Sequence, residues 1–336
     1  MSDSERFVLG YDIGGTKVAV CVADSTGKIL ADDRLASGAI SAYETVLPDM
    51  IALGKRLVGE AGLQMSDIKA CGVCAPGPLD LVGGRIMKSP NLEWDAVPIR
   101  DDLSQGLGAP TFLDNDANAG VLAEWFFGSA KGLKDVIYLT MSTGVGGGVV
   151  TGGHLMQGTT GIAAELGHVI LDVNGPICGC GMLGCLEAYC GGRNVALRVQ
   201  AALRDRPDHA LLKLPGVDGK IENVNYQVLR EGYKREIPLA IEMWEEACMR
   251  LAQGIGIYMV TFNPELIVLG TLAFYSGDLL MEPVQRYLPR FAWPEFRNAC
   301  RLGITALGHK IGELAGISVA LYGLYEAGEW ELPSAD

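Results

Sequence analysis

Two stretches of this sequence, residues 11–16 and residues 141–148, share one arrangement of small polar residues and glycines. The first reads Tyr-Asp-Ile-Gly-Gly-Thr and the second reads Met-Ser-Thr-Gly-Val-Gly-Gly-Gly. In each case an apolar, strand-like run leads into the glycines and a second one follows them. An internal repeat of this kind predicts two related α/β halves, each beginning with a β-hairpin closed by a glycine turn.

Length and charge limit the class of protein. A chain of 336 residues exceeds the size at which one hydrophobic core usually keeps growing, so we expect two domains. The net charge of -13 argues against nonspecific binding to nucleic acid or to an anionic membrane surface. The most apolar stretch, 251–275, is interrupted by Gln253, Asn263 and Glu265, so it is not a membrane span. We expect a cytoplasmic protein that binds small molecules, with no nucleic acid and no membrane as partner.

The elements expected along the chain alternate between strands and helices. Three strand-like runs at 7–13, 17–23 and 28–35 predict an antiparallel meander. Further strands are expected at 69–75, 111–113, 136–142 and 266–269, and helices at 43–61, 117–127 and 311–327, with a long helix ended by Asn263 and Pro264. Residues 204–236, which are charged and contain two prolines, are predicted to form a surface excursion.

Four potential metal ligands lie within eighteen residues: His168, Cys178, Cys180 and Cys185. One imidazole and three thiolates are the ligand set of a closed tetrahedral structural zinc, and the intervening glycines allow sharp chain reversals. A disulfide is the alternative, but no signal peptide is recognisable and thiols in the cytosol stay reduced. The sequence therefore predicts a structural zinc site.

Two carboxylates accompany this cluster. Glu165 lies three residues before His168, and Glu187 lies two residues after Cys185. A metal-braced loop would hold both in place, as a site that binds a polar ligand through several hydrogen bonds requires. The alternative is that both are solvated surface glutamates.

The repeated glycine turns indicate a nucleotide. Facing each other across a cleft, they would offer backbone N–H groups to a polyphosphate from two sides. Neither is a Walker loop, since Gly-Gly-Thr-Lys at 14–17 lacks the four-residue spacer and precedes a strand. Asp12 would lie near the phosphates, where a carboxylate is tolerable only with a divalent cation between the negative groups. The sequence therefore implies Mg²⁺.

Asn115 and Asp116 follow an apolar strand and open a helix, so either could be a simple N-cap. Considered together with Glu165, His168 and Glu187, Asp116 is the natural general base, because a carboxylate can accept the proton of a hydroxyl that attacks a phosphoryl group. Asn115 would then position the same substrate.

In combination these motifs resemble the ROK family (repressors, open reading frames, kinases), and specifically its bacterial-type glucokinases. The resemblance spans nearly the whole chain and rests on segments 12–17, 75–80, 90–92, 114–118, 143–148, 165–168 and 178–187. It implies an actin-like ATPase fold of two ribonuclease-H-like α/β domains around a central cleft. Residues 1–116 with 313–336 would form the N-terminal domain, and 117–312, with the zinc loop 168–185, the C-terminal domain.

The resemblance also implies roles for single residues. Asp116 would be the base for the sugar 6-hydroxyl, and His168 would hold zinc through one ring nitrogen and sugar through the other. The sugar would be bound by Asn91, Asn115, Asp116, Glu165, His168 and Glu187. ATP would be bound by Asp12, Gly14, Gly15, Thr16, Lys17, Thr143, Gly144 and Gly270. A homodimer or homotetramer is expected from the resemblance alone.

The sequence departs from the family pattern at two places. Gly270 is followed by Thr271 where the family often has paired glycines, which leaves the adenosine side and the identity of the phosphoryl donor open. Ala164 stands where many members place a glycine before the glutamate.

These observations lead to one main hypothesis and two alternatives. The main hypothesis is an ATP-dependent hexose kinase, a glucokinase that converts ATP and D-glucose to ADP and D-glucose 6-phosphate. Kinases for fructose, allose, mannose, N-acetylglucosamine or N-acetylmannosamine use the same catalytic parts. The alternative of another class is a sugar-sensing transcription regulator without its DNA-binding domain, which the acidic charge and the first strand at Phe7 argue against.

Overall fold

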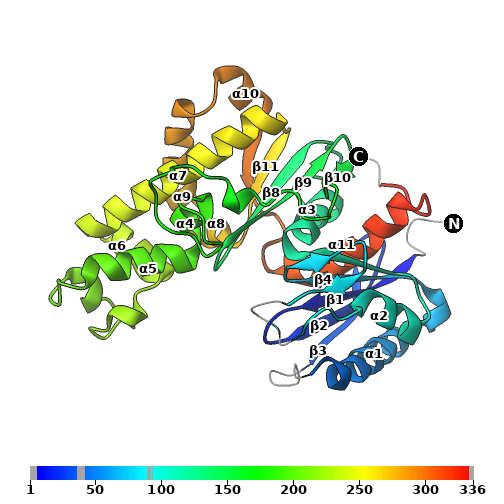
Figure 1. Ribbon diagram of the computed structural model, residues 1–336. Coiled ribbons are helices and arrows are strands. Elements are labelled where there is room, and N and C mark those ends of the chain that lie inside the picture. The colour runs from blue at the N-terminus through cyan, green and yellow to red at the C-terminus, as the bar shows by residue number, and fades with distance from the viewer. Residues whose placement is uncertain (1–5, 36–41, 89–91, 93, 333–336) are drawn as a thin grey trace. The chain divides into compact units, whose positions relative to one another are not determined.

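The computed structural model describes residues 6–35, 42–88, 92 and 94–332, and the chain divides into two compact units (Figure 1). Unit 1 takes in residues 1–134, 148–163 and 306–336. Unit 2 takes in residues 135–147 and 164–305. Among the described residues, no helix has the length and apolar character needed to span a membrane.

The sheet of unit 1 has the strand order β3-β2-β1-β4-β7. These strands are β1 (Phe7–Ile13), β2 (Val18–Asp24), β3 (Ile29–Leu35), β4 (Ile68–Ala75) and β7 (Thr111–Asn115). β1, β2 and β3 pair antiparallel, which confirms the predicted meander, whereas β1, β4 and β7 pair in parallel. Parallel neighbours need crossover connections, and helices α1 (Tyr43–Glu60) and α2 (Ile99–Leu107) lie in them.

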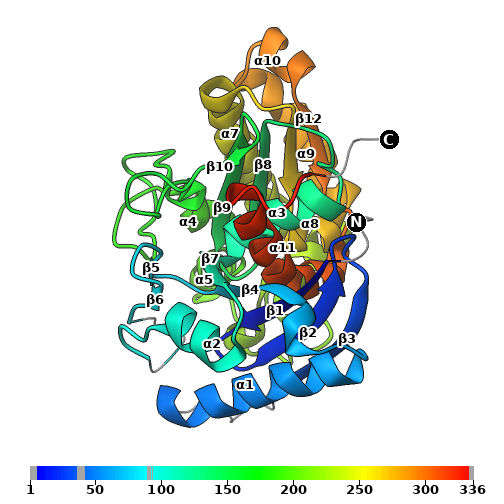
Figure 2. The ribbon, with the colours of Figure 1, turned by 90° about the vertical axis from the view of Figure 1, so that its right-hand side faces the viewer.

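Helices cover this sheet on two faces (Figure 2). α1 packs on β2 and β3, and the hydroxyl of Tyr11 donates to the carbonyl of Met50 in that helix. On the other face, α11 (Ile311–Glu326) packs on β1 and β4, and α3 (Asp116–Phe127) packs on α11. The approach of α11 is close, since a Cβ at Gly72 would lie 2.0 Å from the carbonyl oxygen of Gly316. Glycine at position 72 therefore sets how near the helix sits to the strand.

The second sheet repeats this topology. Its order is β10-β9-β8-β11-β12, with β8 (Val136–Met141), β9 (Val145–Thr151), β10 (His154–Leu155), β11 (Leu266–Leu269) and β12 (Arg301–Ile304). If the strands of each sheet are numbered in chain order, both sheets have the same spatial order: third, second, first, fourth, fifth. β11 pairs in parallel with β8 and with β12. The shared order agrees with the internal repeat read from the two glycine turns.

Unit 2 has one long helix, α7 (Pro238–Phe262), and most of its other helices pack against it. The others are α4 (Leu186–Cys190), α5 (Gly192–Leu203), α6 (Tyr226–Lys234), α8 (Thr271–Ser276), α9 (Asp278–Tyr287) and α10 (Pro294–Ala299). α7 begins at Pro238, whose missing N–H costs nothing in the first turn, and ends at Asn263 in a left-handed conformation with φ of 46°. The predicted stop at Asn263 is confirmed.

The segment 204–236 is exposed over much of its length, as a surface excursion would be, but some of its apolar side chains are buried. Leu211 and Leu229 are fully buried there, and the ring of Tyr226 lies 5.3 Å from that of Trp244 in α7. Most of the charged residues are exposed, as a surface excursion requires, whereas α6 gathers apolar residues, which charged ones separate in the sequence, on the side that faces α7.

Candidate active site

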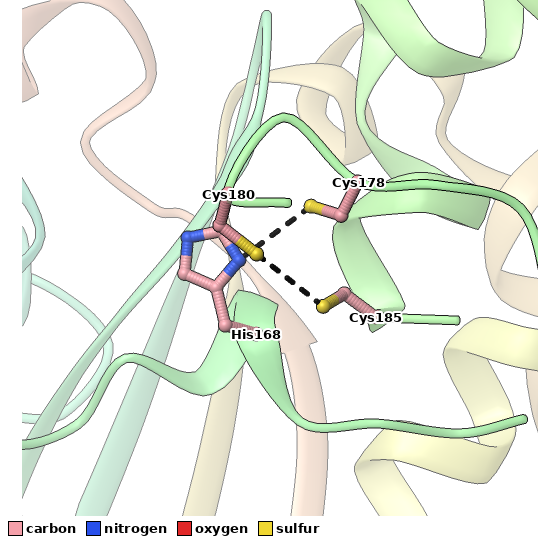
Figure 3. A group of neighbouring side chains, drawn as sticks. All are labelled: His168, Cys178, Cys180 and Cys185. Carbon is pink, nitrogen blue, oxygen red and sulfur yellow. Dashed lines mark hydrogen bonds between the residues drawn. The ribbon is translucent and has the colours of Figure 1, made fainter. Parts of the chain in front are cut away.

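The four predicted metal ligands converge in unit 2 (Figure 3). His168 ends a 3-10 turn (Leu166–His168), Cys178 and Cys180 lie in a loop, and Cys185 immediately precedes α4. The Sγ atom of Cys178 is 3.7 Å from Nδ1 of His168, and the Sγ atoms of Cys180 and Cys185 are also 3.7 Å apart. Two sulfur ligands at about 2.3 Å from a tetrahedral ion are themselves roughly 3.7 Å apart. The spacing therefore fits a single metal ion of the size of zinc.

Glycines shape the loop that carries these cysteines. The N–H of Cys178 donates to the carbonyl of Met182 at 2.8 Å, which closes a tight turn around Cys180. Gly184 has a φ of 70°, and a Cβ at that position would lie 1.7 Å from the carbonyl oxygen of Asp172. A larger residue at position 184 would displace the chain just before Cys185.

The three thiols differ in their acidity. Burial raises the pKa of Cys178 to about 12 and also raises that of Cys185. The pKa of Cys180 is lowered, chiefly because the N–H of Met182 stabilises its thiolate. A cation is needed to hold all three as thiolates, so metal binding to this cluster should release protons.

Two carboxylates flank the cluster. The second ring nitrogen of His168, Nε2, lies 4.0 Å from Oε2 of Glu165. Glu187, in the first turn of α4, accepts from the thiol of Cys178 at 3.4 Å through Oε1 and from the backbone N–H of Val145 at 2.9 Å through Oε2. Glu187 therefore connects the metal loop to the second glycine turn, a link that sequence reasoning missed.

The second glycine turn is also held by the start of α5. The carbonyl of Ser142 accepts from the N–H of Gly192 at 2.9 Å, and that of Thr143 accepts from the N–H of Arg193 at 3.0 Å. A Cβ at Gly144 would lie 2.3 Å from Oε2 of Glu187. The absence of a side chain at position 144 lets the turn and the glutamate meet.

Gly270 and Ala164, which mark the two places where the sequence departs from the family pattern, also lie in unit 2. Gly270 lies between β11 and α8. A Cβ there would lie 2.4 Å from the hydroxyl oxygen of Tyr138. Ala164, directly before Glu165, has a φ of 62°. This left-handed conformation is unfavourable for any residue with a Cβ. The backbone at position 164 therefore favours glycine, the residue that the family pattern leads one to expect there.

In unit 1 the first glycine turn joins β1 to β2. The N–H of Gly14 donates to the carbonyl of Lys17 at 2.9 Å, and the residues between them are exposed. Asp12 lies half-buried at the base of this hairpin, beside a cavity of about 340 Å³ that Lys17 also lines. Burial raises the pKa of Asp12 to about 6, although nearby Lys17 opposes the shift and Asp116 adds to it.

Asn115 and Asp116 lie where β7 ends and α3 begins. Asn115 is the N-cap of α3, because its Oδ1 accepts from the backbone N–H of Asn118 at 2.8 Å. Asp116, the first residue of the helix, has a solvent-accessible carboxylate. The surrounding protein removes part of its hydration and raises its pKa, whereas the backbone N–H groups of Ala117 and of Asp116 itself act in the opposite direction.

The predicted site residues are thus divided between the two units. Unit 1 contains Asp12, Gly14, Gly15, Thr16, Lys17, Asn115 and Asp116. Unit 2 contains Thr143, Gly144, Glu165, His168, Cys178, Cys180, Cys185, Glu187 and Gly270. Asn91, the remaining predicted sugar ligand, lies outside the described residues.

Fold and site together define a two-domain α/β protein with a three-cysteine, one-histidine cluster that could bind a metal ion. The family model of the ROK family matches residues 8–320. The chain belongs to the ROK family. It therefore has the actin-like ATPase fold, as expected from the sequence.

Several relatives resemble the chain over nearly their whole length. A glucokinase from Thermotoga maritima is 32% identical over 317 residues, covering 93% of this chain and 96% of the relative. The crystal structure of a ROK hexokinase from Thermus thermophilus is 33% identical with a TM-score of 0.80, covering 95% of this chain and 99% of that one. A ROK family glucokinase from Streptomyces griseus, in complex with glucose and AMPPNP, is 30% identical with a TM-score of 0.73, covering 94% and 99%. Xylose repressors match as well.

Proposed function

We propose that this protein is an ATP-dependent hexose kinase that phosphorylates D-glucose at its 6-hydroxyl. Membership in the ROK family and the similarity to glucokinases support a sugar phosphotransferase. The observation that carries the reaction type is the accessible carboxylate of Asp116 at the first turn of α3. Such a carboxylate is available to a bound hydroxyl, whereas a sugar sensor has no need of a base.

The proposed chemistry assigns one proton transfer to the protein. Asp116 accepts the proton of the sugar 6-hydroxyl as its oxygen attacks the γ-phosphorus of ATP, and the bond from that phosphorus to the β,γ-bridging oxygen breaks. Partial desolvation raises the pKa of Asp116 and makes the carboxylate a better base than one in water. The helix N–H groups beside it favour the ionised carboxylate and counteract part of that shift.

Sugar recognition is proposed for polar groups at the starts of α3 and α4 and on the 3-10 turn Leu166–His168. Asn115 in unit 1, together with Glu165, His168 and Glu187 in unit 2, would hydrogen-bond to the remaining hydroxyls. Each hexose hydroxyl both donates and accepts, so carboxylates, an amide and an imidazole can read its stereochemistry. Nδ1 of His168 is the ring nitrogen next to Cys178, whereas Nε2 lies 4.0 Å from Oε2 of Glu165, so Nε2 would be the one that meets the sugar.

Two metal ions are part of the proposal. His168, Cys178, Cys180 and Cys185 would hold zinc, which when bound keeps the loop rigid without contacting the phosphates. Asp12 would hold Mg²⁺, which when bound offsets the charge of the ATP phosphates. The half-buried position of Asp12 fits this role, since a cation beside a partly buried carboxylate offsets the cost of its lost hydration.

The test is release of ADP from Mg²⁺-ATP with a panel of glucose, mannose, fructose, allose, N-acetylglucosamine and N-acetylmannosamine. We expect turnover with glucose, and a loss of about 10²–10⁴-fold in kcat for Asp116→Asn with sugar binding retained. Asp101→Asn, the same change in the first turn of α2, is the matched control. Turnover confined to another sugar would overturn glucose as substrate, and retained turnover in Asp116→Asn would remove Asp116 as the base.

A further inference from the structure

The carboxylate of Asp114, two residues before Asp116, is buried and points back into unit 1, with only 3% of its surface exposed. Its Oδ1 accepts from the backbone N–H of Asn115 at 2.8 Å and from Nδ2 of Asn118 at 2.7 Å. Asn118 in turn donates its backbone N–H to the side chain of Asn115. One carboxylate therefore holds the end of β7 and the first turn of α3 together.

The other oxygen of Asp114 has a partner from a distant part of the chain. Oδ2 accepts from Nε2 of Gln157 at 2.7 Å. Gln157 lies just after β10, and the segment is anchored there because the N–H of Met156 donates to the carbonyl of Val149 and that of Ala163 donates to the carbonyl of Gln157. The hydrogen bond from Gln157 thus ties the start of α3 to a segment fixed by its own backbone bonds.

Burial makes this arrangement sensitive to the loss of a single partner. Burial raises the pKa of Asp114, and the hydrogen bonds from Asn118, Asn115 and Gln157 counteract that shift. Without Gln157, Oδ2 would lose this donor and depend on water in the adjacent cavity of about 370 Å³, which both side chains line; an unpaired buried acceptor costs more than the hydrogen bond contributes. The carboxylate would then turn toward water or take up a proton, and the first turn of α3 would move with it.

We infer that Gln157 is a positioning residue for the proposed base: through Asp114 it holds the first turn of α3 so that the carboxylate of Asp116 meets the substrate hydroxyl. The inference rests on the proposed function. A displacement of about 1 Å at a reacting group can lower the rate on the order of 10²-fold. The role of Gln157 should therefore appear in kcat, with sugar KM affected much less.

The first experiment compares Gln157→Leu with wild type in ADP release with glucose and Mg²⁺-ATP. Leucine is of similar size but cannot donate to Asp114. We expect kcat to fall by about 10- to 100-fold while the KM for sugar changes less than about threefold. Gln200→Leu is the matched control, since Gln200 donates to the carbonyl of Val224 at 2.8 Å in unit 2, away from the proposed site residues. It should leave kcat unchanged.

A pair of variants guards against simple loss of folding. Gln157→Glu places two carboxylates in contact, which should also lower kcat. Combining it with Asp114→Asn exchanges donor and acceptor, because the new asparagine amide can donate to the new glutamate while its oxygen still accepts from Asn115 and Asn118. We expect the double variant to recover kcat to within about fivefold of wild type, as an interaction energy between contacting residues requires.

The outcomes separate the inference from the proposed function. If wild type is active, two results would overturn the inference and leave the proposed function standing. One is a normal kcat in Gln157→Leu, and the other is a double variant that does not recover kcat. A wild type without turnover on any sugar of the panel would overturn both.

Discussion

Asp12, a proposed site residue, opposes folding when no ligand is bound. Its carboxylate is half-buried beside Lys17, and burial raises its pKa to about 6 from an ordinary value of 3.8. In the unfolded chain this group loses its proton near pH 4, but in the folded protein it does so only near pH 6. Folding therefore becomes less favourable as pH rises through this interval.

The corresponding prediction concerns Asp12→Asn. The variant should gain stability over wild type as pH rises from 4 to 6, reach a constant difference above pH 6, and show none below pH 4. The shift corresponds to at most about 3 kcal/mol. Urea unfolding of the ligand-free protein between pH 3.5 and 8 measures it, with the exposed Asp49→Asn as control. A difference that does not depend on pH would contradict the assignment.

The sequence predicted which residues come together where closely spaced cysteines and a histidine have a well-defined chemical role, the binding of a metal ion. His168, Cys178, Cys180 and Cys185 were expected to converge, and their ligand atoms lie within 4.8 Å of one another. The sequence offered no signal for Gln157, because a lone glutamine in a loop is ordinary and its partner Asp114 is 43 residues away. The same limit applies to Glu187, whose bond to Val145 spans 42 residues.

At the scale of elements, the second glycine turn depends on its contact with α4. A Cβ at Gly144 would lie 2.3 Å from Oε2 of Glu187, so Gly144→Ala must push that carboxylate off the N–H of Val145. We expect the KM for ATP to rise roughly tenfold, in line with the loss of one hydrogen bond to a charged group. Steady-state kinetics with varied ATP measures it.

The matched control for this change is Gly59→Ala in α1. A Cβ there meets no atom within 4 Å. Alanine in a helix is favoured over glycine by roughly 0.5–1 kcal/mol, so this variant should be at least as stable as wild type and keep its kinetics. An equal KM for ATP in Gly144→Ala and Gly59→Ala would show that the turn tolerates displacement of Glu187.

Element boundaries were predictable where a local rule sets them. β1 runs from Phe7 to Ile13 and α7 ends at Asn263, as the strand pattern and the Asn-Pro stop indicate. The packing of α6 against α7 was not predictable from the sequence. The apolar residues of α6 lie on one face only when the chain is helical from its N-cap, Asn225, onward. Local patterns specify elements, whereas the partner of each element depends on the rest of the chain.

At the scale of the whole molecule, the metal cluster belongs to unit 2 alone, whereas the large core around Leu9, Val73 and Leu103 lies in unit 1. Calorimetry should therefore show two transitions, of which chelation lowers only the one of unit 2. Binding of a structural metal contributes directly to folding, so the shift should be large. Leu9→Ala, which removes a fully buried side chain, should lower the other transition and so identify it.

Variants of the metal loop sharpen this prediction. Cys180→Ala should reproduce the effect of the chelator and weaken sugar binding in calorimetric titration, because Glu187 contacts the same loop. Ile177→Ala, which changes an exposed neighbour in that loop, should do neither. Transitions that shift together on chelation, or unchanged sugar affinity in Cys180→Ala, would contradict the prediction.

The place of α11 in the chain has a consequence for how the protein is made. This helix covers one face of the first sheet, against β1 and β4, yet it follows residues 164–305 of unit 2 in the chain. At about 5–20 residues per second, a ribosome needs roughly 7–28 seconds to translate that intervening segment. For this time the nascent first sheet keeps an uncovered apolar face. The unit translated first is therefore completed last, and until then its protection depends on chaperones rather than on its own sequence.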